Sequence, residues 1–232
     1  MALRARLADF GWTPERLELR ELIANALPGC RPDTVTTLAE SARLRMTQPD
    51  EPIYRQGEPV PMTLILRGYA AFRRTTVDGQ LLTTGVGRAG DLFGWSSMAS
   101  VPSSVELVAL TECEVAQWPG TEIRALAAED PGLAIAAVDS MASSLHIMME
   151  RVGGFLHQDA RRRVIRILAR HRDLFFGDPA VLTRAHLPGL VGTSREMTGR
   201  VLRQLELEGT LVRVGRAGLR LARPDRLEPD EG

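Results

Sequence analysis

The chain has 232 residues, and its 29 basic side chains balance its 29 acidic side chains. Every basic residue is an arginine, because the sequence contains no lysine. Hydrophobic residues make up 44% and charged residues 25%, values that fit a folded globular protein and exclude a disordered or collagen-like chain. No stretch of about 18 residues is free of charge and the N-terminus carries no secretory signal, so we expect no membrane span and a cytoplasmic protein.

The charges are unevenly distributed along the chain. Residues 1–156 carry 14 arginines against 19 acidic residues, a net charge of −5, whereas residues 157–232 carry 15 arginines against 10, a net charge of +5. Arginine presents a planar fork of donors that matches phosphate and guanine. The asymmetry therefore indicates a C-terminal module that binds a polyanion.

The first expected elements are two helices between residues 13 and 45. Thr13-Pro14 is a suitable helix start, with leucines recurring at helical spacing until Pro28-Gly29 ends the run. A second short helix is expected to start at Asp33 or Thr34 and to reach Leu44.

Short strands are expected between residues 51 and 119, where glycines divide the chain into pieces rich in β-branched and aromatic residues. Asp78-Gly79 is typical of a tight hairpin turn, because glycine supplies the positive φ. Many short strands with regular turns favour a barrel or roll. The expected strands are Met62–Arg67, Tyr69–Thr76, Leu81–Val86, Val105–Leu110 and Glu114–Trp118.

A long helix is expected from Thr121 to about residue 157, with Pro131 in a first turn and Gly153-Gly154 as a hinge near its end. Its apolar residues recur at alternating spacings of three and four, which is the seam of a coiled coil. This face either pairs with a second copy in a dimer or packs onto the strands. The predicted interface residues are Val138, Met141, Leu145, Met148, Val152 and Phe155.

Two short helices joined by a glycine-containing turn are expected between Leu182 and Gly209, which is the pattern of a helix-turn-helix. Ser194 or Thr193 caps the second helix, whose buried stripe comprises Met197, Val201, Leu202 and Leu205. Residues 211–221 then alternate apolar and polar around a glycine turn and predict a two-stranded wing. The N-terminal part of the second helix is the part that enters the major groove.

This arrangement resembles the bacterial Crp/Fnr transcription regulators, relatives of the cyclic AMP receptor protein, over roughly Glu51 to Leu227. Its most specific part is Val191–Gly209, which is similar to the recognition-helix signature of that family. Four further segments resemble the effector-binding roll of the family: Gly68, Asp78-Gly79, Gly90–Gly94 and Cys113–Ala116. The resemblance implies an α+β fold: an N-terminal β-roll of the cyclic-nucleotide-binding, jelly-roll type, a long dimerisation helix and a C-terminal winged helix-turn-helix.

The resemblance also implies which residues contact DNA. Arg195, Glu196 and Arg200 would face base edges, since arginine reads guanine and glutamate accepts from cytosine. Ser194 would touch phosphate at the helix N-terminus. The remaining predicted DNA contacts are Gly199, Arg203, Arg213 and Arg216. One departure is Pro188-Gly189 inside the first helix, where the family has better helix formers.

The effector pocket departs further from the family. Cyclic-nucleotide-binding members carry a glutamate for the ribose and an arginine for the cyclic phosphate after the counterpart of Gly94. Here the arginine position falls at about Ser103, and no arginine occurs between Arg88 and Arg124. Because a buried phosphate needs a fixed cation, the sequence argues against cyclic AMP in the usual mode. Some other small ligand, or none, would occupy Gly94, Trp95, Ser96, Ser97, Ser103 and Ser104.

The cofactor is unknown from the sequence. Cys30 and Cys113 cannot supply the four thiolates of an iron–sulfur cluster, and we expect them to be buried small hydrophobic residues. Haem stays open because it needs only one or two ligands. His146 is a candidate, although a lone histidine there is more often a packed or surface residue, and the four histidines show no metal-site spacing.

We therefore predict three segments: a sensor domain at residues 1–120, a dimerisation helix at 121–157 and a DNA-binding domain at 158–232. The predicted function is a homodimeric regulator of transcription on an inverted-repeat DNA site, with RNA polymerase as a further partner if it activates. Two alternatives are a ligand-binding module that acts through protein contacts and a constitutive DNA binder. No enzyme motif is found.

Overall fold

The computed structural model describes residues 14–77, 79–223 and 227. Thr13 and Asp78, which the sequence assigned to a helix cap and a hairpin turn, lie outside these residues. The helices are α2 (Pro14–Ala26), α3 (Pro32–Ser41), η1 (Trp95–Ala99, 3-10), α4 (Gly120–Glu129), α5 (Pro131–His157), α6 (Ala160–Arg170), α7 (Arg172–Phe176), α8 (Leu187–Val191) and α9 (Arg195–Leu207). The strands are β1 (Arg43–Thr47), β2 (Pro52–Tyr54), β3 (Met62–Arg67), β4 (Tyr69–Thr75), β5 (Leu81–Arg88), β6 (Leu92–Phe93), β7 (Glu106–Ala109), β8 (Cys113–Trp118), β9 (Leu211–Val214) and β10 (Gly218–Leu221).

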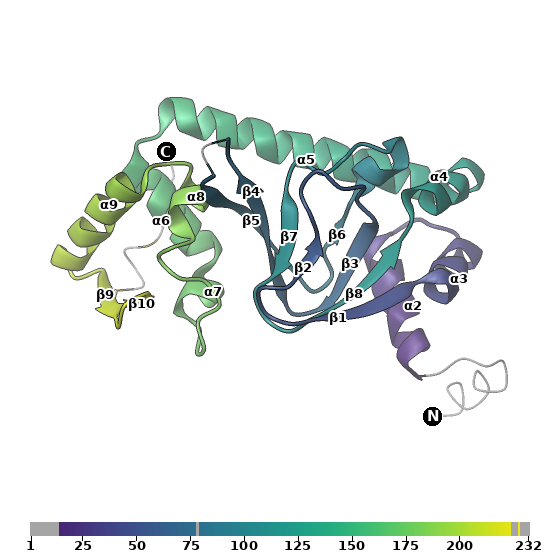
Figure 1. Ribbon diagram of the computed structural model, residues 1–232, viewed down its shortest axis with the longest axis horizontal. Helices are drawn as coiled ribbons and strands as arrows, with labels where there is room; N and C mark the ends of the chain where they lie inside the picture. Colours follow the sequence, from purple (N-terminus) through teal and green to yellow (C-terminus); the bar gives the residue numbers. More distant parts are fainter. Residues whose placement is uncertain (1–13, 78, 224–226, 228–232) are drawn as a thin grey trace. The chain divides into compact units, whose positions relative to one another are not determined.

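The first eight strands form two four-stranded sheets (Figure 1), with strand orders β1-β8-β3-β6 and β2-β7-β4-β5. Apart from β4 and β5, which are neighbours in the second sheet, successive strands alternate between the two sheets, as in a jelly roll. Strand β8 pairs antiparallel with both β1 and β3. The predicted β-roll and the α+β class are confirmed. The five predicted strands are present, with ends that agree to within two residues.

Three strands were not predicted. β2 and β6 have only three and two residues, too few to show an alternating pattern. β1 lies where the second predicted helix was expected to continue to Leu44, so that expectation is wrong: the helix ends at Ser41. Two arginines interrupt β1, whose other side chains except Thr47 are largely exposed, and this exposure hid its strand character.

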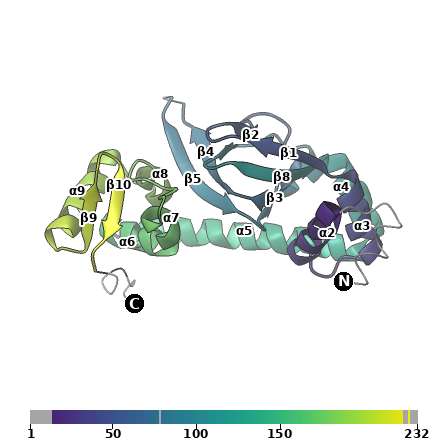
Figure 2. The ribbon, with the colours of Figure 1, turned by 90° about the horizontal axis from the view of Figure 1, so that it is seen from below.

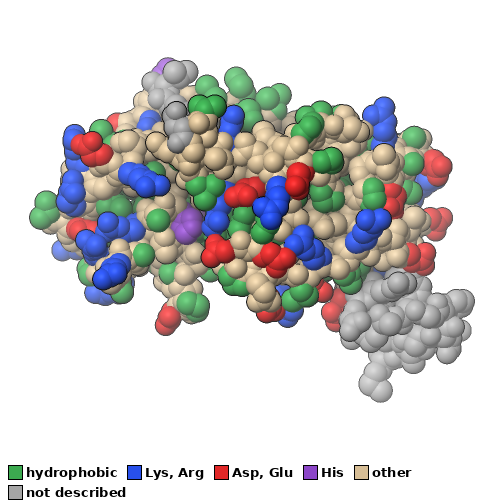
Figure 3. All heavy atoms as spheres, in the orientation of Figure 1, with side chains coloured by type: hydrophobic (Ala, Val, Ile, Leu, Met, Phe, Trp, Pro, Cys, Tyr) green, Lys and Arg blue, Asp and Glu red, His purple; other side chains and the backbone are tan. Residues whose placement is uncertain are grey.

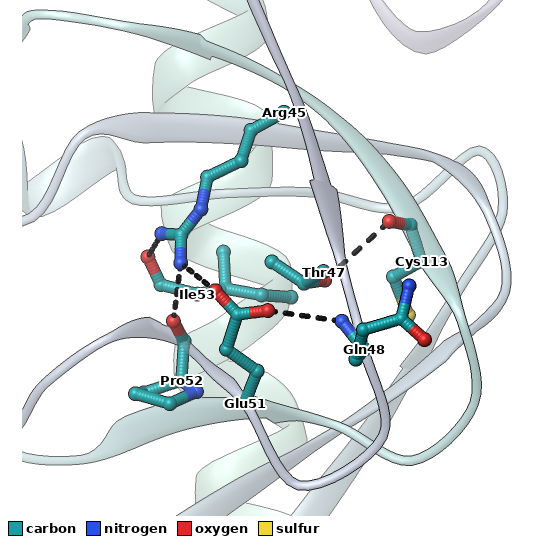
Figure 4. A network of polar contacts seen from close by, with 7 residues as sticks. All are labelled: Arg45, Thr47, Gln48, Glu51, Pro52, Ile53 and Cys113. Atoms are coloured by element: carbon teal, nitrogen blue, oxygen red, sulfur yellow. Dashed lines mark hydrogen bonds and ion pairs between the residues drawn. The ribbon is translucent and has the colours of Figure 1, made fainter.

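The turn between β1 and β2 is fixed by one ion-paired network (Figure 4). Arg45 Nη2 lies 2.6 Å from Glu51 Oε1 and also donates to the carbonyl of Pro52 at 3.1 Å. The second Glu51 oxygen accepts from the backbone N–H of Gln48 at 3.0 Å. These hydrogen bonds from Gln48 and Arg45 hold the pKa of Glu51 below its ordinary value. The network therefore joins the two sheets at a point where the strands are short.

The core of the roll also buries the N-terminal helices. Leu38 of α3, Ile123 of α4 and Leu133 of α5 are fully buried in one cluster with Trp118 of β8. The Trp118 indole N–H donates to the carbonyl of Leu38 at 2.8 Å, so a large aromatic side chain is buried with its polar atom satisfied. Trp95 of η1 belongs to the same cluster.

Asp130 connects the start of α5 to the start of α3. Its side chain is 1% exposed and accepts hydrogen bonds from the backbone N–H groups of Arg31 at 2.8 Å and Gly132 at 2.9 Å. A hydrogen bond from the Thr34 side chain is the largest influence that holds the pKa of Asp130 below its ordinary value. One carboxylate thus satisfies donors at two helix N-termini.

Helix α5 spans 27 residues without a break at Gly153-Gly154. All of its side chains from Met141 to Glu150 are exposed in the single chain, and so are Val138 and Val152. By length and composition alone, Pro131–Gly154 would also suffice to cross a membrane. The sequence predicted no membrane span, because charged residues such as Asp139 and Glu150 interrupt this stretch.

The chain divides into two compact units that differ from the three predicted segments. The first comprises the chain as far as residue 70 together with residues 87–145, and the second comprises residues 71–86 and 146–232. The second unit contains α6 to α9 and the strand pair β9–β10, which lies beside α9 (Figure 2). The predicted wing is therefore present in the form expected.

Candidate nucleic-acid interface

The second helix of the predicted helix-turn-helix is α9. Ser194 is its N-cap, and the Ser194 hydroxyl accepts from the backbone N–H of Met197 at 3.1 Å, as in the motif expected for a serine at this position. Gly192 ends α8 with φ +68°, which allows the tight turn before the cap. The buried stripe of α9 comprises Thr198, Val201, Leu202 and Leu205. The sequence assigned Met197 to this stripe, but Met197 is only half-buried and Thr198 is buried instead.

The first helix, α8, explains the unusual Pro188-Gly189 pair. Pro188 lies in the first turn of α8, where its missing N–H is not needed by the helix. A Cβ on Gly189 would lie 2.5 Å from the carbonyl oxygen of Thr83 and 2.6 Å from its nitrogen. The pair therefore starts a short helix and lets its backbone lie directly against strand β5.

The exposed side of α9 and the wing enclose a hollow of about 430 Å³, which we call the arginine hollow. Arg195 and Arg203 line it from α9. Gly199 lies between them in the sequence and also lines the hollow, and the space where its Cβ would be is open. The wing contributes Arg213 and Arg216. The structure thus brings together five of the residues that the sequence assigned to DNA contact.

One arginine of this hollow was not predicted from the sequence. Arg184 lies in the turn that precedes α8 and lines the hollow together with the α9 and wing arginines. Its backbone N–H donates to the carbonyl of Ala217 at 3.1 Å, which ties this turn to the wing. The only signal in the sequence was its charge, because the approach of the turn to the wing is a tertiary contact.

The electrostatics of the hollow favour a polyanion. Five guanidinium groups line it against one carboxylate, that of Glu206. Figure 3 shows arginine side chains gathered over α9 and the wing on the visible face. Phosphate oxygens and guanine edges are the groups that such a surface binds in DNA.

The other predicted DNA residues lie on a second strip of α9. Glu196 and Arg200, one turn apart, form an ion pair with 3.3 Å between Arg200 Nη2 and Glu196 Oε1. Both side chains are strongly exposed, at 82% and 65%, and the pair is therefore easily separated by competing partners. Ser194 is exposed at the start of the same strip. Neither Glu196 nor Arg200 lines the arginine hollow.

The residues predicted for an effector pocket do not share one environment, because some are buried and others are exposed. Gly94 has φ +92°, and a Cβ there would collide with the carbonyl oxygen of Pro61. Trp95 packs in the core cluster, Ser97 is buried, and Ser96 and Ser104 are exposed. Ser97 lines a surface hollow of about 490 Å³ with Pro59, Trp118 and neighbouring residues.

Ser103 is engaged within the roll. Its hydroxyl donates to the carbonyl of Val105 at 2.5 Å, and it accepts from the Val105 N–H at 3.2 Å. It also forms a hydrogen bond with Tyr54, which is buried, and burial raises the pKa of the Tyr54 hydroxyl above its ordinary range. The Ser103 hydroxyl is thus engaged by Val105 and Tyr54.

The candidate sensing residues Cys30, Cys113 and His146 do not form one site among the described residues. Cys113 is buried, Cys30 is half-buried, and burial raises the pKa of both thiols, that of Cys30 to about 11. His146 is exposed on α5. Across the described ranges, no three His, Cys, Asp or Glu side chains lie close enough together to hold a metal ion.

Comparison with known proteins gives one consistent result. The cyclic nucleotide-binding domain family matches residues 44–130. The cAMP-activated global transcriptional regulator Vfr of Pseudomonas aeruginosa is 29% identical over 186 residues, 74% of this chain and 86% of that protein. The regulator CRP of Salmonella typhimurium is 27% identical over 66% of this chain and 78% of its own.

Solved structures show the same fold. The c-di-GMP responsive regulator CLP of Xanthomonas campestris superimposes with a TM-score of 0.68 at 23% identity, over 83% of this chain and 100% of that chain. At this identity the likeness shows the fold, which combines a cyclic-nucleotide-binding-like roll, a long helix and a winged helix-turn-helix. In sequence, the chain matches the cyclic nucleotide-binding domain family over part of its length and is similar to Crp/Fnr regulators such as Vfr and CRP, in line with the resemblance noted from its motifs.

Proposed function

We propose that the protein is a sequence-specific DNA-binding regulator of transcription that acts in the cytoplasm as a homodimer on an inverted-repeat site. The arginine hollow carries this proposal, because α9 and the wing converge there with five arginines and one carboxylate. A recognition helix reads bases while wing arginines contact phosphates. The Vfr and CRP proteins, to which the chain is similar, are transcriptional regulators by name. If the protein activates transcription, RNA polymerase is its further partner.

Base reading is assigned to Arg195, Glu196 and Arg200. The first two residues of α9 carry two of these side chains, at the end of the helix that the major groove admits. The Glu196–Arg200 pair is exposed and held by a single long contact, so both side chains are free to exchange this partner for base edges. Arg213 and Arg216 are assigned to phosphates.

The test begins with selection of bound sequences from random DNA duplexes, which supplies an operator. Arg195→Ala and Arg200→Ala should each weaken operator binding by about 1–3 kcal/mol per lost base contact and relax the preferred sequence. Arg172→Ala, an exposed arginine of α7 outside the hollow, is the charge-matched control. If both α9 variants still distinguish the operator from scrambled DNA as the wild type does, the assignment of α9 to base reading is refuted.

The homodimer is proposed from the exposed seam of α5. Val138, Met141, Leu145, Met148 and Val152 recur at spacings of three and four and are 44–63% exposed in the single chain. The Phe155 side chain, which the sequence added to this seam, lies outside the described residues. A second copy of the same helix is the occupant that such a seam fits, because self-pairing of a heptad pattern buries both faces at once.

The oligomeric state tests this seam directly. Leu145→Glu places a charge in the middle of the seam and should convert the dimer to a monomer in light scattering coupled to size-exclusion chromatography. Ser143→Glu adds the same charge on the opposite side of the same exposed stretch and should leave the dimer intact. Equal masses for the two variants would exclude this helix as the interface.

For the roll, we propose control by a small ligand other than cyclic AMP held in the family's usual mode. Similar proteins are described as cAMP-activated or c-di-GMP responsive, but here Ser103 stands where the resemblance would put the phosphate-binding arginine, and its hydroxyl is bonded to the backbone of Val105. The same observation favours a second candidate, a constitutive DNA binder. A thermal-shift screen of nucleotides with an absorption spectrum of fresh protein separates them, since a chromophore indicates haem and an unshifted melting curve favours constitutive binding.

A further inference from the structure

A pocket of about 280 Å³ lies within the second unit, where the C-terminal part of α5 meets α6 and α8; we call it the junction pocket. Three arginines of α6 line it, namely Arg163, Arg166 and Arg170. Their spacing of three and four residues places them on one face of the helix. The assignment of DNA contacts uses none of these three arginines.

The junction pocket is strongly electropositive. Glu150 of α5 is its one carboxylate, and His146 is one turn earlier on the same helix. Three guanidinium groups and one carboxylate leave a net charge of +2 before the imidazole is counted. The floor between these groups is apolar, with Ile167 of α6 and two residues of α8. A compact ligand with two negative charges and a small carbon body matches this lining.

Two of the arginines lie against the backbone at the end of α5. Arg163 Nη1 donates to the carbonyl of Gln158 at 2.6 Å, just beyond the end of α5. A Cβ added to Gly154 would lie 2.8 Å from Arg166 Nη2 and 3.7 Å from Arg166 Cζ. The Arg166 guanidinium therefore rests against α5 at the one point where a glycine leaves room for it. Gly154, which the sequence assigned to a hinge, therefore lies in an unbroken helix and leaves space for the Arg166 guanidinium.

We propose that the junction pocket binds a small dianion, either a phosphate monoester or a dicarboxylate, through Arg163, Arg166 and Arg170. Arginine forks bind the oxygens of either group in pairs, and both groups match the charge of the pocket. Because α5, α6 and α8 each contribute to the lining, a bound dianion fixes the first helix of the helix-turn-helix relative to the end of α5. Its effect on DNA affinity rests on the proposed function; the binding itself does not.

The experiment is isothermal titration of the full-length protein, without DNA and at low ionic strength, with methyl phosphate and with succinate as separate probes. At least one probe should bind saturably with one site per chain. Arg166→Gln should weaken that binding at least about tenfold, since a hydrogen bond between charged groups contributes that much. Arg162→Gln, an exposed arginine of the same helix outside the pocket, should change it less than about twofold.

A pair of adjacent glycines provides the second comparison. Gly154→Ala displaces the Arg166 guanidinium without altering any charge and should weaken binding of the probe severalfold. Gly153→Ala, where the added Cβ meets nothing within 4 Å, should leave binding unchanged. Both changes favour the helix by about 1 kcal/mol, so a difference in binding between them does not arise from helix stability.

The outcomes separate this site from the proposed function. No saturable binding of either probe, or equal binding by Arg166→Gln and the wild type, overturns the proposal. If neither probe binds but Arg166→Gln lowers DNA affinity, the α6 arginines contact the DNA backbone and the proposal is again overturned. Binding that follows the predicted order in a protein that shows no operator preference supports the site and refutes the proposed function instead.

Discussion

Asp130 offers a quantitative test of how the first unit is held together. Asp130→Ala removes the acceptor for the N–H groups of Arg31 and Gly132 and for the Thr34 side chain. Each lost bond leaves a partly buried donor unsatisfied, at a cost of about 1 kcal/mol or more. The sum is about 2–4 kcal/mol, a large share of the 5–15 kcal/mol typical of a whole domain. Asp130→Asn keeps one acceptor oxygen and should lose about half as much.

Urea unfolding followed by circular dichroism measures both variants, and their midpoints give the change in the free energy of unfolding. Glu129→Ala is the matched control, because Glu129 is the preceding residue and is exposed. A loss below about 1 kcal/mol for Asp130→Ala would refute the claim that this carboxylate supports two helix starts.

The same residue gives a pH dependence with a definite sign. The Thr34 hydrogen bond lowers the folded-state pKa of Asp130 below its unfolded value. Its contribution is therefore complete above the unfolded pKa and is lost as the pH falls through the folded pKa. The free energy of unfolding of the wild type should fall more steeply than that of Asp130→Asn as the pH is lowered from neutral. Parallel curves would contradict the shift.

Three further changes test contacts in the two units. Trp118→Phe removes the hydrogen bond to the carbonyl of Leu38 and should cost about 1–3 kcal/mol of unfolding free energy. Gly189→Ala overpacks the contact with Thr83 and should cost about 1–3 kcal/mol, measured by thermal unfolding; an unchanged melting temperature would contradict that contact. Ser194→Ala removes the cap of α9 and should cost about 1 kcal/mol, whereas Ser194→Asp should retain most of the stability.

Local patterns predicted the parts of the fold that local physics decides. Strand Met62–Arg67 and the cap at Ser194 were predicted because strand composition and N-cap chemistry act over a few residues. Strand β1 escaped prediction because its exposed edge carries no alternating pattern. The N-cap of α6 is equally local, because the Asp159 side chain accepts from the backbone N–H of Arg162 at 2.8 Å.

The candidate site was predictable only in part for a related reason. Helical spacing alone puts Arg195, Gly199 and Arg203 on one face, and a two-stranded wing puts Arg213 nearby. Arg184 joins them through a turn whose approach to the wing leaves no trace in the sequence. The contact between Gly154 of α5 and Arg166 of α6 in the junction pocket is also a tertiary contact, and the periodicity of the sequence does not predict it.

The discontinuity of the second unit limits how the protein can be dissected. It comprises residues 71–86 and 146–232, and the residues between these two segments, 87–145, belong to the first unit. A fragment that begins at residue 146 lacks Thr83, the backbone against which Gly189 is fitted, and exposes a surface that was never selected to meet water. Genetic fusions and truncations should therefore keep strands β4 and β5 with the C-terminal helices, because no single cut yields a complete module.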